Sequence, residues 1–271
     1  MVKQLFYIKD SERELPAQQV LSVQLGTKHC CLALTNKDGD QLFKLFYYGV
    51  SEFDPNPLPN IFEQNEWLKN PFYQVLISYD YPQNVLTPAA FYKPDEGARL
   101  LKGIYAVNGS SAIIAESVDD WQLHNIYAVP KEVHEYLVRH FTGAKYWHKF
   151  SIQLKGIEKA NDNEVLLVDF KTDEFTVLAV AEGKVLLTQT FCYTSPEDVL
   201  YHLLKICSTL NLSQERLLLS LSGLIDQRSN LYNELYNYFI HPEFRTARWR
   251  TGEEHPSHFF TTLNDLARCA S

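Results

Sequence analysis

EVLLVDFKTDEFTVLAVAEGKVLLTQTFCY, residues 164–193, is the most regular stretch of the chain. Three mainly apolar runs, 165–170, 175–180 and 185–193, alternate with short polar turns at 171–174 and 182–183. Apolar runs of this length between turn residues are typical of buried strands. The stretch therefore predicts three consecutive strands joined by tight turns.

An earlier segment repeats this pattern. VLSVQL at 20–25, a turn at 26–29, a run at 30–34, a turn at 36–40 and a run at 41–48 follow the same order. The two copies lie about half the chain apart, which indicates a duplicated domain.

Composition excludes some classes of function. The 271 residues include 25 Lys and Arg and 33 Asp and Glu, a net charge of −8, which disfavours nucleic acid as a partner. No apolar run approaches the roughly 20 residues that span a bilayer, and the first residues do not resemble a signal peptide. The five cysteines are odd in number and follow no metal-ligand spacing. We expect a cytoplasmic protein with reduced thiols, no transmembrane segment and no metal site.

The remaining pattern predicts an α/β fold in two halves, 1–156 and 157–271, with a small insertion around 81–130 in the first. No element is predicted in the lead-in 1–19. The expected helices are 60–68, 95–102, 131–141, 196–210, 226–239 and 256–268, and the further strands are 74–79, 112–117, 124–129, 217–221 and 245–249.

This order of elements resembles the actin-like ATPase fold, the duplicated, ribonuclease H-like architecture of actin, sugar kinases and heat-shock chaperones. The chain is similar to a bacterial family of unknown function with that fold, related to the pilus-assembly protein PilM and the division protein FtsA. The resemblance implies two lobes, and in the superfamily the cleft between them holds ATP and Mg²⁺.

The first phosphate turn of that superfamily runs apolar-Asp-apolar-Gly-Thr/Ser, and here residues 23–27 read VQLGT. Gly26 and Thr27 match, since glycine lets backbone amides approach a phosphate and the hydroxyl can donate to it. Lys28 adds a positive charge. Gln24 replaces the acid, and an amide cannot anchor hydrated Mg²⁺ as a carboxylate does. The alternative is an ordinary hairpin turn.

The second phosphate turn is expected at residues 169–174, DFKTDE, where relatives have Asp-apolar-Gly-Gly-Gly-Thr. Asp169 matches as a candidate catalytic or metal-orienting acid, and its alternative role is to cap the turn. Lys171 and Thr172 occupy the glycine positions as candidate phosphate contacts. Two further acids, Asp173 and Glu174, should repel a phosphate.

The adenosine turn is expected at residues 219–226, LSLSGLID, where relatives have two glycines. Gly223 keeps one of them, and its alternative role is a simple strand-to-helix turn. The resemblance therefore favours a degenerate, weakly binding or non-hydrolysing nucleotide site, or a scaffold that binds an unidentified protein. The alternative is an active ATPase or ATP-dependent kinase, with Gly26, Thr27 and Lys28 on the phosphates and Asp169 acting on a metal or on water.

Overall fold

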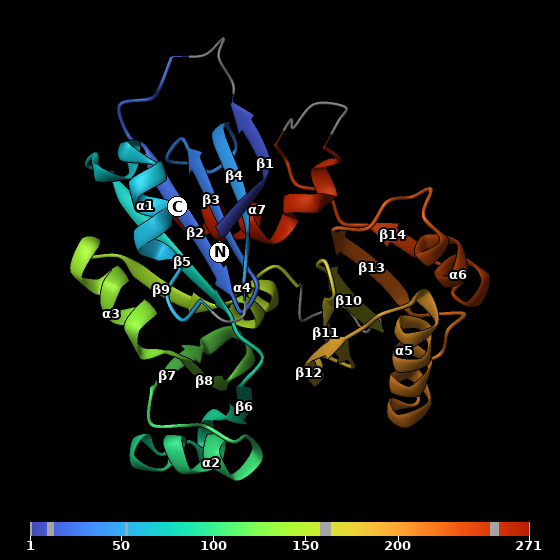
Figure 1. Cartoon of the computed structure of the whole chain (residues 1–271). Helices are drawn as coiled ribbons and strands as arrows, with labels where there is room; N and C mark the ends of the chain where they lie inside the picture. Colours follow the sequence, from blue (N-terminus) through green and yellow to red (C-terminus); the bar gives the residue numbers. More distant parts are fainter. Residues whose placement is uncertain (1, 10–13, 52–53, 158–163, 250–254, 271) are drawn as a thin grey trace. The chain divides into compact units, whose positions relative to one another are not determined.

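The computed structural model describes residues 2–9, 14–51, 54–157, 164–249 and 255–270, and the chain forms two compact units (Figure 1). The first unit contains residues 1–156 together with 263–271, and the second contains residues 157–262. In the first unit, Asn264 Nδ2 donates to the Gly39 carbonyl at 3.1 Å, which ties the end of the chain to the turn after β3.

The strands are β1 Val2–Lys9, β2 Val20–Gly26, β3 His29–Thr35, β4 Leu42–Val50, β5 Gln74–Asp80, β6 Asn84–Pro88, β7 Ser111–Val118, β8 Leu123–Pro130, β9 Lys145–His148, β10 Val165–Phe170, β11 Glu174–Ala181, β12 Lys184–Cys192, β13 Leu218–Gly223 and β14 Pro242–Phe244. The α-helices are α1 Leu58–Gln64, α2 Gly97–Ile104, α3 Lys131–His140, α4 Lys149–Lys155, α5 Pro196–Leu210, α6 Asn230–Tyr238 and α7 Thr261–Ala267. Short 3-10 helices are η1 Glu66–Lys69, η2 Ala89–Phe91, η3 Pro94–Glu96, η4 Asp119–Trp121, η5 Ser257–Phe260 and η6 Arg268–Ala270.

The first unit is built on a six-stranded sheet in the order β1-β4-β3-β2-β5-β9. β2, β3 and β4 form the predicted antiparallel meander, and β5 and β9 run parallel to β2. The interpretation of residues 1–19 as a lead-in without an element was wrong, because β1 pairs with β4 along Val2–Lys9. Its mixed polar and apolar residues gave little local signal, and the strand exists through pairing with a distant segment.

The predicted insertion is a three-stranded sheet, β6-β8-β7, with α2 against it. Leu101 of α2 packs on Ile126 and Ala128 of β8 in a small core of its own. The strands predicted at 112–117 and 124–129 are confirmed as β7 and β8, each slightly longer. α2 begins two residues later than predicted, after the 3-10 turn at 94–96.

The second unit repeats the strand order of the first. Its sheet runs β12-β11-β10-β13-β14, with β10 to β12 antiparallel and β13 and β14 parallel to β10. The first sheet has the same order and directions from β4 to β9, with β1 added at its end. The pattern of two similar meanders therefore corresponds to two sheets of the same topology.

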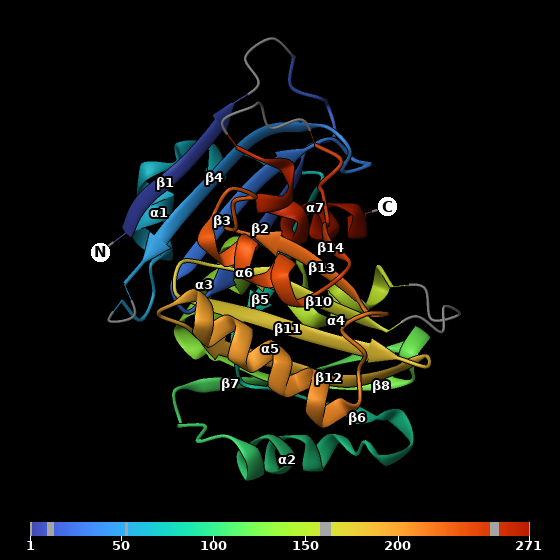
Figure 2. The same ribbon diagram turned by 90° about the vertical axis from the view of Figure 1, so that its right-hand side faces the viewer.

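Helices cover each sheet with apolar side chains. In the first unit, α1 and α3 share one core with the central strands. In the second unit, α5 and α6 pack on the sheet (Figure 2). α5 starts with a capping box in which Ser195 and Asp198 exchange hydrogen bonds.

Two elements of the second unit differ from the prediction. α6 starts at Asn230 rather than residue 226, because Asp226 Oδ1 accepts from the Arg228 amide and Ser229 caps the helix. The last strand is β14 at 242–244 rather than 245–249. Pro242 is tolerated there because it is the first residue of a strand at the end of the sheet.

Candidate functional site

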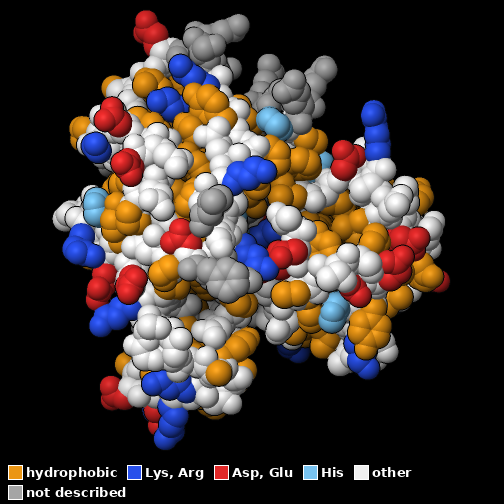
Figure 3. Space-filling view, viewed as in Figure 1, with side chains coloured by type: hydrophobic (Ala, Val, Ile, Leu, Met, Phe, Trp, Pro, Cys, Tyr) orange, Lys and Arg blue, Asp and Glu red, His pale blue; other side chains and the backbone are white. Residues whose placement is uncertain are grey.

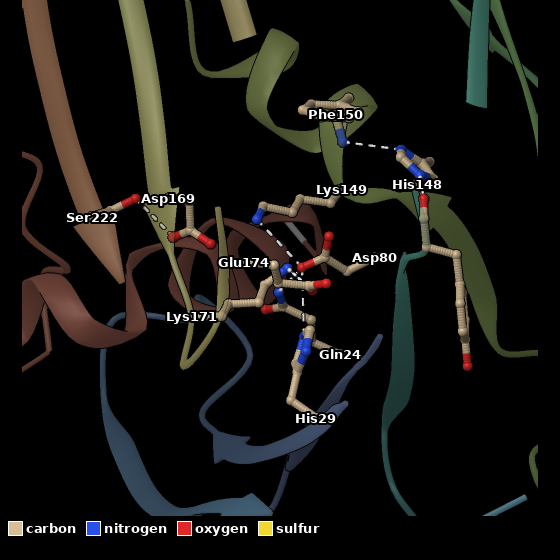
Figure 4. Close-up of polar contacts among 11 residues, drawn as sticks. Gln24, His29, Asp80, His148, Lys149, Phe150, Asp169, Lys171, Glu174 and Ser222 are labelled. Carbon is tan, nitrogen blue, oxygen red and sulfur yellow. Dashed lines mark hydrogen bonds and ion pairs between the residues drawn. The ribbon is translucent and has the colours of Figure 1, made fainter. Parts of the chain in front are cut away.

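Four buried side chains meet where β2 and β5 of the first unit end. Asp80 Oδ2 lies 3.2 Å from Gln24 Nε2, 3.4 Å from His29 Nε2 and 3.3 Å from Lys149 Nζ. Figure 4 shows the three side chains converging on this carboxylate from β2, β3 and the start of α4. The carboxyl ends of parallel strands are where α/β sheets bind ligands, so this cluster, which we call the Asp80 cluster, lies where a site is expected.

The Asp80 cluster is shielded from water. Asp80 is 4 % exposed, His29 3 % and Lys149 1 %. A lysine this deeply buried needs a counter-charge, since an ammonium loses several kcal/mol of hydration on burial. Asp80 provides that charge, and the Gln24 amide donates a further hydrogen bond to it.

The predicted phosphate turn lies beside this cluster. A Cβ added at Gly26 would collide with the His29 ring and would lie 2.9 Å from the Asp80 carbonyl oxygen. Gly26 is therefore required by the close approach of its own neighbours. Thr27 and Lys28 follow Gly26 in the same turn, as predicted. Because Thr27 is exposed and Lys28 is half-buried, neither belongs to the buried Asp80 cluster.

Gln24 has a different chemical role from the acid that it replaces in the resemblance. Its amide nitrogen donates to Asp80, which a carboxylate at this position could not do. A second acid there would also place two negative charges side by side in a buried site. The glutamine is therefore matched to Asp80 and Lys149.

In the second unit, Asp169 lies at the corresponding end of β10. Its Oδ1 accepts a hydrogen bond from Ser222 Oγ at 2.8 Å, across the parallel pair β10 and β13 (Figure 4). Burial lowers the pKa of the Arg245 guanidinium, and the attraction of Asp169 opposes that shift. Asp169 thus accepts a hydrogen bond from Ser222 and attracts the charge of Arg245.

The predicted second phosphate turn is a closed hairpin. The Lys171 amide donates to the Glu174 carbonyl at 2.8 Å, leaving Thr172 and Asp173 as the loop. The Lys171 ammonium lies 3.4 Å from Glu174 Oε1, and both side chains are buried. The charge of Glu174, one of the two acids expected to repel a phosphate, is thus paired with Lys171 in this unit.

Tyr193 ties this hairpin to the end of β12. Its hydroxyl donates to the Lys171 carbonyl at 2.8 Å, and its amide donates to the Asp173 carbonyl at 3.0 Å. Thr172 is exposed at the tip. The hairpin backbone is thus engaged within its own unit.

Gly223 adopts a left-handed conformation, with φ +80°, at the end of β13. A Cβ there would lie 2.7 Å from the Phe170 nitrogen and would collide with the Phe170 carbonyl oxygen. Leu224 N donates to that same oxygen at 2.8 Å. The glycine is therefore needed for a strand-to-helix turn, which is the alternative role considered for it in the sequence analysis.

The sequence interpretation missed His29, Asp80 and Lys149. Asp80 had a usable signal, since it ends an apolar strand that runs parallel to the one ending at Gly26. Lys149 had none, because a lysine at the start of a helix is normally solvated. The residues that the structure describes contain no group of three His, Cys, Asp or Glu placed to hold a metal ion.

A hollow of about 590 Å³ in the second unit lies at the other end of β10. It is lined by Glu164, Ala181, Glu182, Lys184, Leu186, Leu210, Asn211, Leu212 and Arg216. None of the candidate site residues is among these. Within the described residues, no helix is both long and apolar enough to cross a bilayer.

Comparison with known proteins places the fold. Residues 10–241 match the sequence profile of a family described as "Protein of unknown function (DUF3822)". No curated protein matches the chain.

Three solved structures are similar in fold. A Bacteroides thetaiotaomicron protein with an actin-like ATPase fold and unknown function has a TM-score of 0.75 at 18 % identity, over 84 % of this chain and 91 % of that one. The PilM–PilN type IV pilus biogenesis complex gives 0.58 at 11 % identity, over 94 % and 99 %. The ethanolamine utilization protein EutJ from Carboxydothermus hydrogenoformans gives 0.52 at 10 % identity, over 94 % and 91 %. The actin-like ATPase fold predicted from the sequence is confirmed.

Proposed function

The chain belongs to the DUF3822 family of proteins of unknown function, and on that premise we propose that it is a protein-binding module that uses an actin-like fold without nucleotide hydrolysis. The two units are, in this proposal, the duplicated halves of that fold, and the sites that hold ATP and Mg²⁺ in the superfamily are degenerate. The observation that carries the proposal is the Asp80 cluster.

In the Asp80 cluster, the groups that would otherwise bind a phosphate contact other residues of the protein. A phosphate-binding turn exposes backbone amides and a positive charge to the ligand. Here the His29 ring packs over Gly26, and the nearby ammonium of Lys149 is directed to Asp80. Binding a phosphate at this position would require moving His29 and separating a buried ion pair, which costs several kcal/mol.

The second unit supports the same proposal. Relatives place three glycines where this chain has Lys171, Thr172 and Asp173, and these residues form a hairpin closed by Glu174 and Tyr193. A Mg²⁺ ion prefers carboxylate and water oxygens in octahedral array. The Asp169 carboxylate accepts a hydrogen bond from Ser222, and Gln24 has no carboxylate that could bind Mg²⁺. These contacts support the proposal that the residues present do not fit a Mg–ATP complex.

For an actin-like fold that does not hydrolyse a nucleotide, the proposed function is to bind a protein partner. The similar PilM structure is a complex of PilM with PilN. The unknown partner of this chain would bind whether or not a nucleotide is present. In a pull-down, recovery of that partner should be unchanged by Mg–ATP.

Thermal unfolding with and without Mg–ATP tests the proposal. A site with a dissociation constant of about 10 µM would, at about 1 mM nucleotide, stabilise the fold by about 2.7 kcal/mol, which is several degrees in Tm. We expect a shift below about 1 °C and no ATP turnover.

The contrary result has its own control. Thr27 is exposed, so Thr27→Val should leave the fold intact while removing the hydroxyl that a phosphate would meet. A shift of several degrees that disappears in Thr27→Val, together with turnover that is lost in Asp169→Ala, would refute the proposal. It would support the active ATPase or kinase, to which the retained Gly26 and Thr27 turn points.

A further inference from the structure

The strand that the sequence did not predict, β1, ends the first sheet. Among the described residues it pairs with one strand only, β4, and Figures 1 and 2 both show it at the margin beside β4. A strand at the end of a sheet presents backbone donors and acceptors on every second residue, which can pair with another extended chain.

β1 also exposes apolar side chains at this margin. Leu5 is 40 % exposed and Tyr7 is 46 % exposed. The Tyr7 ring lies on Phe46 of β4 with centroids 4.7 Å apart, and Phe46 in turn lies 5.6 Å from Trp67. An added strand would extend this aromatic row and cover Tyr7 and Leu5.

The strand β1 contains two lysines and no acid, although the chain as a whole carries −8. Lys9 of β1 is directly opposite Lys44 of β4, and Lys3 lies on the same strand. Burial lowers the pKa of the Lys44 ammonium, and repulsion from Lys9 lowers it further. Like charges opposite each other on adjacent strands are destabilising. Figure 3 shows basic side chains among apolar ones over this part of the first unit.

We propose that the outer edge of β1 binds an extended, acidic segment of a partner protein by strand addition. Side chains alternate along a strand, so Tyr7 and Lys9 share one face. The matching segment carries an apolar residue beside Tyr7 and an acid two positions away, beside Lys9. The acid relieves the repulsion between Lys9 and Lys44, and the apolar residue covers the exposed ring.

Charge selects this occupant over a second copy of the chain. Two antiparallel β1 strands side by side would set Lys3 of each copy opposite Lys9 of the other, and β1 itself contains no acid to compensate them. The inference rests on the proposed partner-binding role and specifies the surface that serves it.

A fluorescently labelled, capped peptide made of repeats of Glu-Thr-Val-Thr is the probe, because it places glutamate and valine alternately on one face of a strand. Its anisotropy is measured against the full chain. We expect saturable binding that weakens with salt and that falls at least about tenfold in Lys9→Glu. The same peptide with lysine for glutamate should bind Lys9→Glu better than it binds the wild type.

Two controls separate strand addition from general charge attraction. Lys102→Glu reverses an exposed lysine on α2 and should leave binding unchanged. Methylating alternate backbone nitrogens of the peptide removes its hydrogen-bond donors without changing its side chains, so it should abolish binding.

Any of three results would overturn the inference. The first is that the unmodified peptide shows no saturable binding, the second is that the methylated peptide binds as tightly as the unmodified one, and the third is that Lys9→Glu and Lys102→Glu weaken peptide binding equally. A concentration-dependent dimer that Lys9→Glu dissociates would show a second copy at this edge instead, and would overturn it too. A Mg–ATP shift in Tm tests the proposed function separately, because it does not involve β1.

Discussion

Replacing Lys149 with methionine tests the central physical argument, the internal neutralisation of the Asp80 cluster. The change keeps an unbranched chain of similar length but removes the ammonium 3.3 Å from the Asp80 carboxylate. Asp80, 4 % exposed, would then be a buried carboxylate that has lost the ammonium beside it. Removing one partner of a buried ion pair costs about 3–5 kcal/mol. Urea unfolding followed by tryptophan fluorescence and circular dichroism measures that loss.

A double-mutant cycle separates the ion pair from lost packing. Asp80→Asn alone should also destabilise the fold, because it leaves Lys149 buried without its counter-charge. In the double variant no charge is left unpaired, so its loss of stability should be smaller than the sum of the two single losses by about 2 kcal/mol. Lys102→Met, on an exposed lysine, should change stability by less than about 0.5 kcal/mol. Additive losses in the cycle would refute the reasoning.

Three further predictions concern other parts of the fold. Burial raises the pKa of Glu116 from its usual 4.5 to about 7, so its stabilising contribution is complete below about pH 4.5 and is lost as the pH rises through about 7. Glu116→Gln should therefore stabilise the protein by about 1–3 kcal/mol at about pH 8.5 and by little near pH 4.5, and equal effects in urea unfolding at both pH values would contradict this. Gly223→Ala should cost about 2 kcal/mol or more because its Cβ meets the Phe170 backbone, whereas Gly143→Ala, with similar φ but open space, should cost clearly less in the same assay. Ser195→Ala should lose about 1 kcal/mol with its capping box, and unchanged unfolding would mean that the box is absent in solution.

The sequence alone was sufficient for the repeated meanders and for the fold class. Residues 165–193 and 20–48 form strands because their apolar runs and turn residues act locally, within a few positions along the chain. The helix predicted at 196–210 is confirmed as α5, which begins at a serine cap and has an apolar stripe, both local features of the chain. Local signals of this kind survive in a single sequence.

The tertiary structure decided β1 and the chemistry of the candidate site. β1 becomes a strand only through β4, more than 30 residues away. Asp80, Lys149 and His29 come from separate elements, and only folding brings them together around one buried carboxylate. Whether Gly26 faces a ligand or a histidine ring depends on that packing. The sequence motif predicts the turn at Gly26, but only the folded structure determines which side chains pack beside it.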